Sequence, residues 1–425
     1  MLLQKIKNNQ ILIKNTGYLS IIEIIRLVMP FVALPYIIKT VGTENYGLAI
    51  FAQTIISYFS IFINFGLDIS ALKDVSINRD NKEKLSKIVS AVLSIKSILF
   101  VISVVVLLLI LHIIPFLKVH KLLFLYAFLA CFSELLFPAW FYQGIEKMKY
   151  ITIIRTLSII LYTGSVFLFI HTPQDYIKIV LLQSLSHLLA GFVSLYLLIH
   201  IESIKLLKVD RRLLKNIFKE SIPFFFSRLS VVLNNTMAKT VSGIFFSMNI
   251  VAAFDIAQKV ATVSLVPMQM MNQAVFPKIA QTLSKQFVSK FLKLNVCISF
   301  IVAFFVFLFA PMAIRFFAGD RMPEAVTLIR ILSIWVFAGG ITTYLGAPVL
   351  VSFGYPKQFN ISVILSTLIL LGCYGVLYIG NWFTIYMFAM ALAASELAIL
   401  AYRWYYCLQF EIIDLNGFFR IKGKI

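Results

Sequence analysis

PAWFYQGIEKMK (Pro138–Lys149) and APVLVSFGYPKQ (Ala347–Gln358) share one spacing within a chain of 425 residues. Each copy places Gly six residues after Pro, and Lys three residues after that Gly, and the copies lie 210 residues apart. That separation is close to half of the chain. A repeat at this distance predicts that the protein arose by doubling of one structural unit.

The composition around both copies is that of a membrane protein. Hydrophobic residues make up 60% of the chain and charged residues 13%, whereas soluble proteins carry about 25% charged residues. A bilayer-spanning helix needs about 20 mostly apolar residues, and the apolar runs here are continuous, unlike the alternating pattern of barrel strands. Such runs begin near Tyr18, Tyr46, Ile88, Leu122, Ile151, Ile177, Ile222, Ala252, Phe291, Ala325, Phe359 and Phe383. The predicted fold class is an all-α integral membrane protein with twelve transmembrane helices.

The repeat predicts how these helices are organised. Its two copies end the fourth and tenth runs, and a second echo, an Ala-Gln pair at Ala52–Gln53 and Ala257–Gln258, lies in the second and eighth. Six helices separate the partners in each case, so both halves enter the membrane in the same direction. We therefore expect two six-helix lobes around a central cavity, residues 1–201 and 221–425, with a cytoplasmic linker at 202–220 and a short cytoplasmic tail.

The basic residues predict the orientation. The chain has 38 Lys and Arg and a net charge of +20. With the N-terminus inside the cell, 26 of them fall on cytoplasmic segments and six on the opposite side, and Lys and Arg are in excess on cytoplasmic loops. Both termini are thus expected in the cytoplasm. Charges spread over short loops exclude a nucleic-acid interface and instead favour contact with anionic lipid head groups.

No residue pattern indicates a metal site, a cofactor site or an enzyme. The cysteines are single and lie in apolar runs, and the histidines are isolated, so no paired ligand spacing or nucleophile–base set is present in the sequence. The cysteines are Cys131, Cys297, Cys373 and Cys407.

Arginines in the first helix of each predicted lobe are the strongest functional candidates. A charge at a helix centre costs about 2.5–3.5 kcal/mol on the insertion scale, so it needs a reason. Arg26 and Arg228 lie at similar depth in proline-bearing helices, and two guanidinium groups facing one cavity would suit a phosphate group. The alternative is a structural role in which each Arg pairs with an acid, as Arg26 could with Glu23.

Other charges within apolar runs have simpler interpretations. Asp255 and Lys259 stand at i, i+4, which allows an ion pair, while Asp255 could instead bind a coupling proton or sodium ion. Lys96 and Arg330 lie within two or three turns of a helix end, where a long side chain can reach the head groups. Glu134 has no obvious partner nearby in the sequence.

Four segments carry a resemblance to a known family: MPFVALPYIIKTVGTENYGLAIFAQTI (Met29–Ile55), FGLDISALKDVS (Phe65–Ser76), PAWFYQGIEKMKYI (Pro138–Ile151) and FPKIA (Phe276–Ala280). They resemble the O-antigen (Wzx-type) polysaccharide flippases of the multidrug/oligosaccharidyl-lipid/polysaccharide (MOP) exporter superfamily. The resemblance implies a MOP/MATE-like fold that moves undecaprenyl-diphosphate-linked oligosaccharide from the cytoplasmic to the periplasmic leaflet of the bacterial inner membrane by alternating access. It also implies coupling to H⁺ or Na⁺. An O-antigen polymerase and a chain-length regulator are partners expected from the family alone.

The predicted site residues fall into three groups. The cationic-cavity candidates are Arg26, Arg228, Lys239 and Lys259. The coupling or ion-pair candidates are Glu23 and Asp255. The candidate sugar contacts are Gln53, Asn234, Asn235, Gln258, Gln269 and Gln273, although polar side chains also join membrane helices to one another.

Three alternatives stay open. A MATE-like drug/cation antiporter would share the fold but prefer an acidic cavity. A peptidoglycan-precursor flippase commonly carries more than twelve spans. A membrane polymerase or glycosyltransferase would need a long periplasmic loop, whereas the longest predicted outside loop has about a dozen residues, an ordinary length for a connection.

Overall fold

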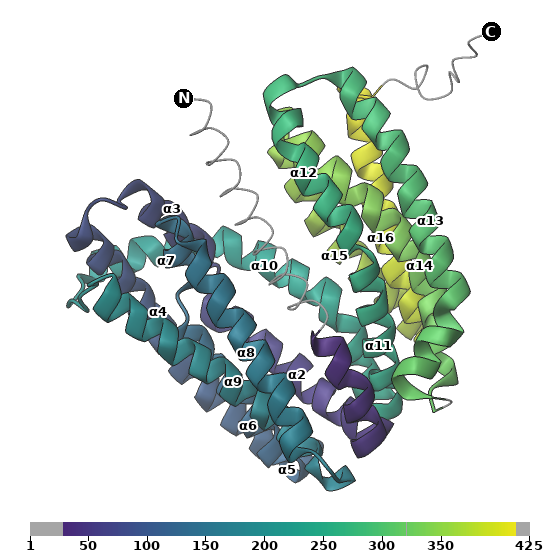
Figure 1. The fold of residues 1–425 in the computed structure, drawn as a ribbon, viewed down its shortest axis with the longest axis horizontal. Helices are drawn as coiled ribbons and strands as arrows, with labels where there is room; N and C mark the ends of the chain where they lie inside the picture. The colour runs from purple at the N-terminus through teal and green to yellow at the C-terminus, as the bar shows by residue number, and fades with distance from the viewer. Residues whose placement is uncertain (1–28, 320, 414–425) are drawn as a thin grey trace, which may run out of the picture. The chain divides into compact units, whose positions relative to one another are not determined.

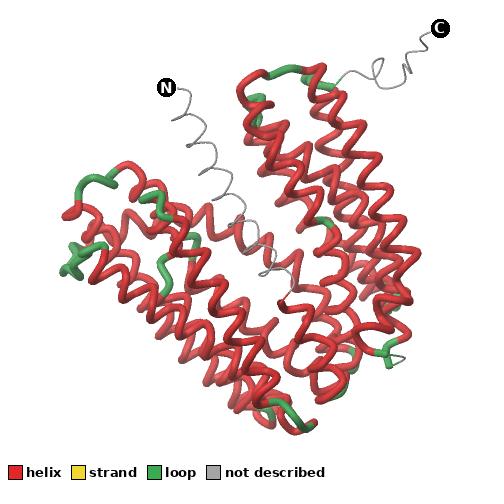
Figure 2. Tube along the Cα trace, viewed as in Figure 1, coloured by secondary structure: helices red, strands yellow, loops and turns green. Residues whose placement is uncertain are grey.

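The computed structural model describes residues 29–319 and 321–413, and throughout these residues it consists of helices and turns, without β-strands (Figure 2). The all-α class predicted from the sequence is confirmed. The chain forms two compact units, Met1–Leu229 (unit 1) and Ser230–Ile425 (unit 2) (Figure 1). The boundary lies inside a helix, beyond the predicted linker 202–220.

Each unit is a bundle of helices in chain order. Unit 1 contains the helix Met29–Val41, α2 (Thr43–Asn64), α3 (Leu67–Ile77), α4 (Lys82–Ile113), α5 (Pro115–Val119), α6 (Lys121–Leu136), α7 (Ala139–Gly144), α8 (Met148–Phe169), the 3-10 turn η1 (Pro173–Asp175), α9 (Tyr176–Tyr196), the π-helical turn η2 (Leu197–Ile201) and the first half of α10 (Arg211–Phe245). Unit 2 contains the second half of α10, α11 (Met248–Ser264), α12 (Val266–Thr282), α13 (Lys285–Ala318), α14 (Pro323–Tyr344), the π-helical turn η3 (Leu345–Val351), α15 (Pro356–Ile379) and α16 (Ile385–Gln409).

The predicted spans agree with these helices. Within the described residues, 10 helical segments are long and apolar enough to cross a membrane, and Met29–Val41 is a shorter apolar helix. The first predicted run is described only from Met29 onward. The seventh run is α10, which has 35 residues and carries several polar and basic side chains, so it is not among the apolar segments.

Long helices of both units turn large apolar side chains outward. On α4, Ile98, Val101 and Leu108 are exposed, and on α13 Phe300 and Phe304 are exposed. Bands of this kind suit lipid tails, because hydrocarbon is as apolar as these side chains.

The two copies of the Pro-Gly-Lys repeat occupy similar breaks. Pro138 separates α6 from α7, and Pro348 lies in η3 directly after α14. Proline interrupts a helix because it lacks the backbone N–H and clashes with the preceding turn. The two copies need glycine for different reasons, however. Gly354 has a φ of 88°, whereas a Cβ on Gly144 would lie 2.4 Å from Val75 Cγ1.

The FGLD segment (Phe65–Asp68) packs against the first half of α10 and so holds it to the rest of unit 1. Phe65 stacks on Phe218 and on Phe225, with 4.5 Å between ring centroids in both pairs. Next to it, Gly66 has a φ of 70°, and a Cβ there would lie 2.6 Å from the backbone nitrogen of Phe225. Only glycine allows this approach, because it has no Cβ and adopts positive φ without strain.

Arg403 is buried among the helices of unit 2. It lies in α16 with 5% of its surface exposed. Its Nη1 donates to the backbone oxygen of Thr342 at 2.6 Å and its Nε donates to Ser362 Oγ at 2.9 Å. Thr342 precedes the break at Gly346, whose backbone is not helical. Arg403 therefore braces the end of α14, through partners that are distant in the sequence.

Candidate functional site

The predicted arginine pair can be placed only in part. Glu23 and Arg26 lie outside the described residues. Arg228, on α10, donates from Nη2 to Asp68 Oδ2 at 3.2 Å, and its side chain remains 48% exposed. Asp68 belongs to the FGLD segment, whose packing brings α10 close to α3. Arg228 thus has a carboxylate partner and still presents much of its guanidinium surface to ligands.

Three further predicted residues meet in unit 2. Lys239 on α10 lies 3.2 Å from Asp255 Oδ1, and Lys259 lies 2.6 Å from Asp255 Oδ2. Asp255 has 4% of its side chain exposed. The i, i+4 spacing predicted the contact with Lys259, whereas nothing in the sequence indicated that Lys239 would join it. The Asp255 carboxylate thus lies between two ammonium groups.

The candidate sugar contacts of unit 2 mostly bind one another or neighbouring helices. Asn234 donates to Ser366 Oγ and Thr367 Oγ1, both at 2.9 Å, and Gln258 donates to the backbone oxygen of Asn235 at 2.9 Å. These three amides line a cavity of about 70 Å³, which has room for about two waters of about 30 Å³ each. Gln269 and Gln273, on α12, are half-buried and exposed respectively, and do not line it.

Gln53 belongs to a larger cavity within unit 1. This pocket, which we call the unit 1 pocket, has a volume of about 280 Å³. The Gln53 amide binds that of Gln183 at its edge. Its polar lining comes from α2, α6, α8 and α9 and consists of Gln53, Ser57, Ser60, Ser133, Glu134, Arg155, Ser158, Gln183, Ser184 and His187. Polar side chains at facing positions of a helix bundle form its interior sites.

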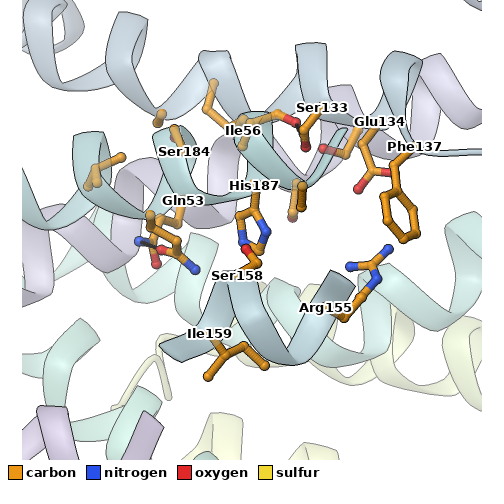
Figure 3. Close-up of a pocket in the computed structure, with 17 residues that line it drawn as sticks. Gln53, Ile56, Ser133, Glu134, Phe137, Arg155, Ser158, Ile159, Ser184 and His187 are labelled. Atoms are coloured by element: carbon orange, nitrogen blue, oxygen red, sulfur yellow. Dashed lines mark hydrogen bonds between the residues drawn. The ribbon is translucent and has the colours of Figure 1, made fainter. Parts of the chain in front are cut away.

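Two charged groups lie at one end of the unit 1 pocket. Figure 3 shows the Glu134 carboxylate and the Arg155 guanidinium at the same end, with the His187 ring between them and Gln53. Arg155 lies 4.7 Å above the Phe137 ring. Arg155, on α8, lines the pocket, although nothing in the sequence singled it out as a site residue.

A partly buried hydrogen-bond network adjoins the pocket. Asn64 Nδ2 donates to Glu134 Oε2 at 3.1 Å, and Lys96 Nζ donates to Asn64 Oδ1 at 2.6 Å and to the backbone oxygen of Glu134 at 3.2 Å. Lys96 has 2% of its surface exposed. The expectation that Lys96 reaches the head groups is therefore wrong, because its amine is held inside the bundle. An ionisable residue within an apolar run was the available signal for both Lys96 and Glu134.

Apolar helices with charged and polar side chains gathered inside each unit define a multi-pass membrane protein of the transporter class. The chain belongs to the polysaccharide biosynthesis protein family, which matches residues 12–283.

Two similar proteins from bacteria carry the same description. The chain is 25% identical over 353 residues to a "Putative O-antigen transporter" of Escherichia coli (strain K12), covering 82% of this chain and 85% of that protein. It is 24% identical over 349 residues to a "Putative O-antigen transporter" of Shigella dysenteriae, covering 76% and 85%. The resemblance to the O-antigen flippase group is confirmed.

Solved structures share the fold. The lipid II flippase MurJ in an inward closed conformation superposes with a TM-score of 0.77 at 13% identity, over 94% of this chain and 89% of that one. An inward-facing multidrug resistance MATE family transporter of the MOP superfamily gives 0.72 at 16% identity, over 91% and 94%. The predicted MOP/MATE-like fold is confirmed.

Proposed function

We propose that the protein is a flippase for undecaprenyl-diphosphate-linked oligosaccharide repeat units of the O-antigen type. It moves them from the cytoplasmic to the periplasmic leaflet of the inner membrane by alternating access, driven by an ion gradient of H⁺ or Na⁺. Both termini lie in the cytoplasm. The observation that carries the proposal is the likeness along most of the chain to the two O-antigen transporter relatives.

The chemistry of the described residues supports a cargo of this class. A sugar diphosphate is too polar to cross hydrocarbon unaided, so the protein has to supply cationic contacts and a hydrated path, and no bond is made or broken. Arg228 exposes a guanidinium, which binds phosphate oxygens in a bidentate way. Lys239 and Lys259 add two ammonium groups, which share the carboxylate of Asp255. An antiporter for cationic drugs would be poorly served by these groups.

The role of Asp255 follows from its two partners. Its carboxylate contacts the ammonium groups of both Lys239 and Lys259, so we propose that Asp255 is a structural ion-pair residue rather than the coupling site. The polymerase and chain-length regulator remain proposed partners that receive the translocated units.

The test is the location of the lipid-linked repeat unit in cells with and without the gene. An impermeant lectin or glycosidase added to spheroplasts marks sugars on the periplasmic face. Deletion should remove the marked pool while total lipid-linked oligosaccharide persists or accumulates, and the restored gene should return it. An unchanged marked pool would overturn the proposal, and dye efflux from the same cells would then show whether the protein exports cationic drugs.

A further inference from the structure

The half-buried carboxylate of Glu134 has its two oxygens in different surroundings. Its Oε2 accepts a hydrogen bond from the Asn64 side-chain NH₂ group. The ammonium group of Lys96 can only donate, so it binds the Asn64 amide oxygen and fixes the orientation of that amide. The Asn64 NH₂ group must then point at the carboxylate. Oε2 is thus fixed as an acceptor, and a proton that reaches Glu134 has to bind Oε1.

The unit 1 pocket supplies a route for such a proton. Its volume of about 280 Å³ has room for about nine waters at about 30 Å³ each. Serine hydroxyls and the two glutamine amides line it together with Glu134 and His187, and chains of Asp, Glu and His side chains with water form proton relays within membranes.

Charged groups near Glu134 come from several neighbouring helices, whereas α2 contributes the uncharged amide of Asn64. His187 on α9 and Arg155 on α8 line the same pocket as Glu134, and both Arg155 and Glu134 act electrostatically on His187. Lys96 faces Glu134 from α4, and Asp68 on α3 acts on Lys96. In the described part of the chain no ion pair closer than 4.0 Å joins Glu134 to any of these cations. Among the described residues, the Glu134 carboxylate therefore has no direct cationic partner.

We propose that the Glu134 carboxylate reversibly binds a proton from the unit 1 pocket, and that this proton is the ion that drives transport. The inference rests on the proposed flippase function and names its coupling ion and site. Binding adds one proton to Oε1 and changes no other bond. Protonation removes the negative charge near Lys96 and turns Oε1 of Glu134 from an acceptor into a donor. The two protonation states therefore stabilise different arrangements of α4 and α6.

Two other carboxylates within the bundles, the buried Asp255 and the half-buried Glu396, fit this role less well. Asp255 lies between Lys239 and Lys259. Glu396 accepts from the Thr342 hydroxyl, and its cavity of about 70 Å³ has room for about two waters. Neither therefore combines a hydrated pocket with a carboxylate that lacks a direct cationic contact.

The first experiment measures proton binding without any substrate. The purified full-length protein in lipid vesicles is treated with dicyclohexylcarbodiimide, which reacts with protonated carboxyl groups in apolar surroundings, and labelled peptides are identified by mass spectrometry. Labelling at Glu134 should rise as the pH falls and should be lost in Glu134→Gln. The control Glu44→Gln removes an exposed carboxylate at the start of α2 and should leave labelling at Glu134 unchanged. Absence of pH-dependent labelling at Glu134 in the folded protein overturns the proposal.

The second experiment measures coupling. Vesicles loaded with lipid-linked oligosaccharide are given a pH gradient or none, and flipping is followed with an impermeant glycosidase. The gradient should accelerate the wild type and Glu44→Gln, whereas Glu134→Gln should flip at one rate in both conditions. A Glu134→Gln variant that keeps the full acceleration overturns the inference, as does acceleration by a sodium gradient in place of a pH gradient.

The two experiments separate this inference from the proposed function. Labelling at Glu134 in a protein that flips no lipid-linked oligosaccharide would keep the proton site and reject the flippase. Flipping whose response to the gradient is lost in Glu396→Gln but kept in Glu134→Gln would keep the flippase and reject Glu134 as the coupling residue.

Discussion

Arg228 combines one carboxylate contact with a large exposed surface, so its two roles can be separated by mutation. We expect Arg228→Ala to reduce flipping about 10-fold or more, since a hydrogen bond to a charged group contributes about 1.5–3 kcal/mol. Arg228→Lys should keep part of the activity, because a point charge retains attraction to a diphosphate but loses the bidentate geometry. Initial flipping rates at equal protein levels measure both effects.

Asp68→Asn is the matched control for Arg228. It removes the carboxylate that lies 3.2 Å from Arg228 and leaves the guanidinium in place. If Arg228 binds the cargo, Asp68→Asn keeps more activity than Arg228→Ala. Equal losses in the two variants would show that the ion pair itself is what matters, and that Arg228 has a structural role.

Asp255 should matter for stability more than for coupling. Asp255→Asn leaves Lys239 and Lys259 facing a neutral amide, and we expect a loss of about 1–3 kcal/mol, below the 3–5 kcal/mol of a fully buried pair because Lys259 is 38% exposed. Thermal aggregation of the solubilised protein measures this. The double variant Asp255→Asn/Lys259→Met should recover part of the loss, since it removes the like-charge contact. Normal stability with a lost response to ion gradients would instead make Asp255 the coupling residue.

Individual contacts were predictable only where the sequence brings the partners close. The spacing of Asp255 and Lys259 within one helix was enough to predict their contact. Lys96 was misread, because its partners Asn64 and Glu134 come from α2 and α6. A single helix does not show which of its faces will be covered. The same reason explains why the unit 1 pocket, built from four helices, had no counterpart in the sequence beyond Gln53.

At the level of elements, Gly66 tests how α10 is held to unit 1. Gly66→Ala would place Cβ 2.6 Å from the Phe225 nitrogen at a φ of 70°, and the φ strain alone costs an L-residue about 1–2 kcal/mol. We expect a clear fall in the thermal stability of the solubilised protein. The control is Gly164→Ala in α8, where an added Cβ would have no other atom within 4 Å. It should be neutral or should stabilise the protein by up to about 1 kcal/mol. Equal stability of both variants would contradict the close packing of α3 and α10.

Helix positions were predicted better than helix roles. The apolar runs located the spans because lipid requires about 20 apolar residues in each. The seventh run was expected to open the second lobe, but α10 contributes Phe218 and Phe225 to the core of unit 1 and Lys239 to the Asp255 cluster of unit 2. Which bundle a helix joins depends on contacts with Phe65 and Asp255, and hydropathy carries no information about them.

For the whole molecule, the repeat correctly indicated matching breaks in the fourth and tenth spans. It also placed Gln53 and Gln258 at equivalent positions, and each of them lines a cavity of its own unit. The cavities nevertheless differ fourfold in volume, about 280 Å³ against about 70 Å³. The two bundles therefore differ in their interior side chains, and this favours different tasks for them.

Membrane orientation is the prediction that covers the whole chain. In a variant with all four cysteines replaced by alanine, single cysteines are introduced at exposed positions: Asp80 and Gln286 among clusters of basic residues, and Thr172 and Ile379 at the opposite helix ends. Because Lys and Arg are retained on the cytoplasmic side, an impermeant maleimide added to intact spheroplasts should label Thr172→Cys and Ile379→Cys alone.

Permeabilised cells provide the control, since all four variants should then react. The pairs also test the parallel repeat, because each pair has one member in each unit. Labelling of Asp80→Cys together with Ile379→Cys in intact cells would mean that the units enter the membrane in opposite directions, against the even number of spans between the two copies of the repeat. Labelling of Asp80→Cys and Gln286→Cys would instead invert the whole molecule, and the expected direction of transport with it.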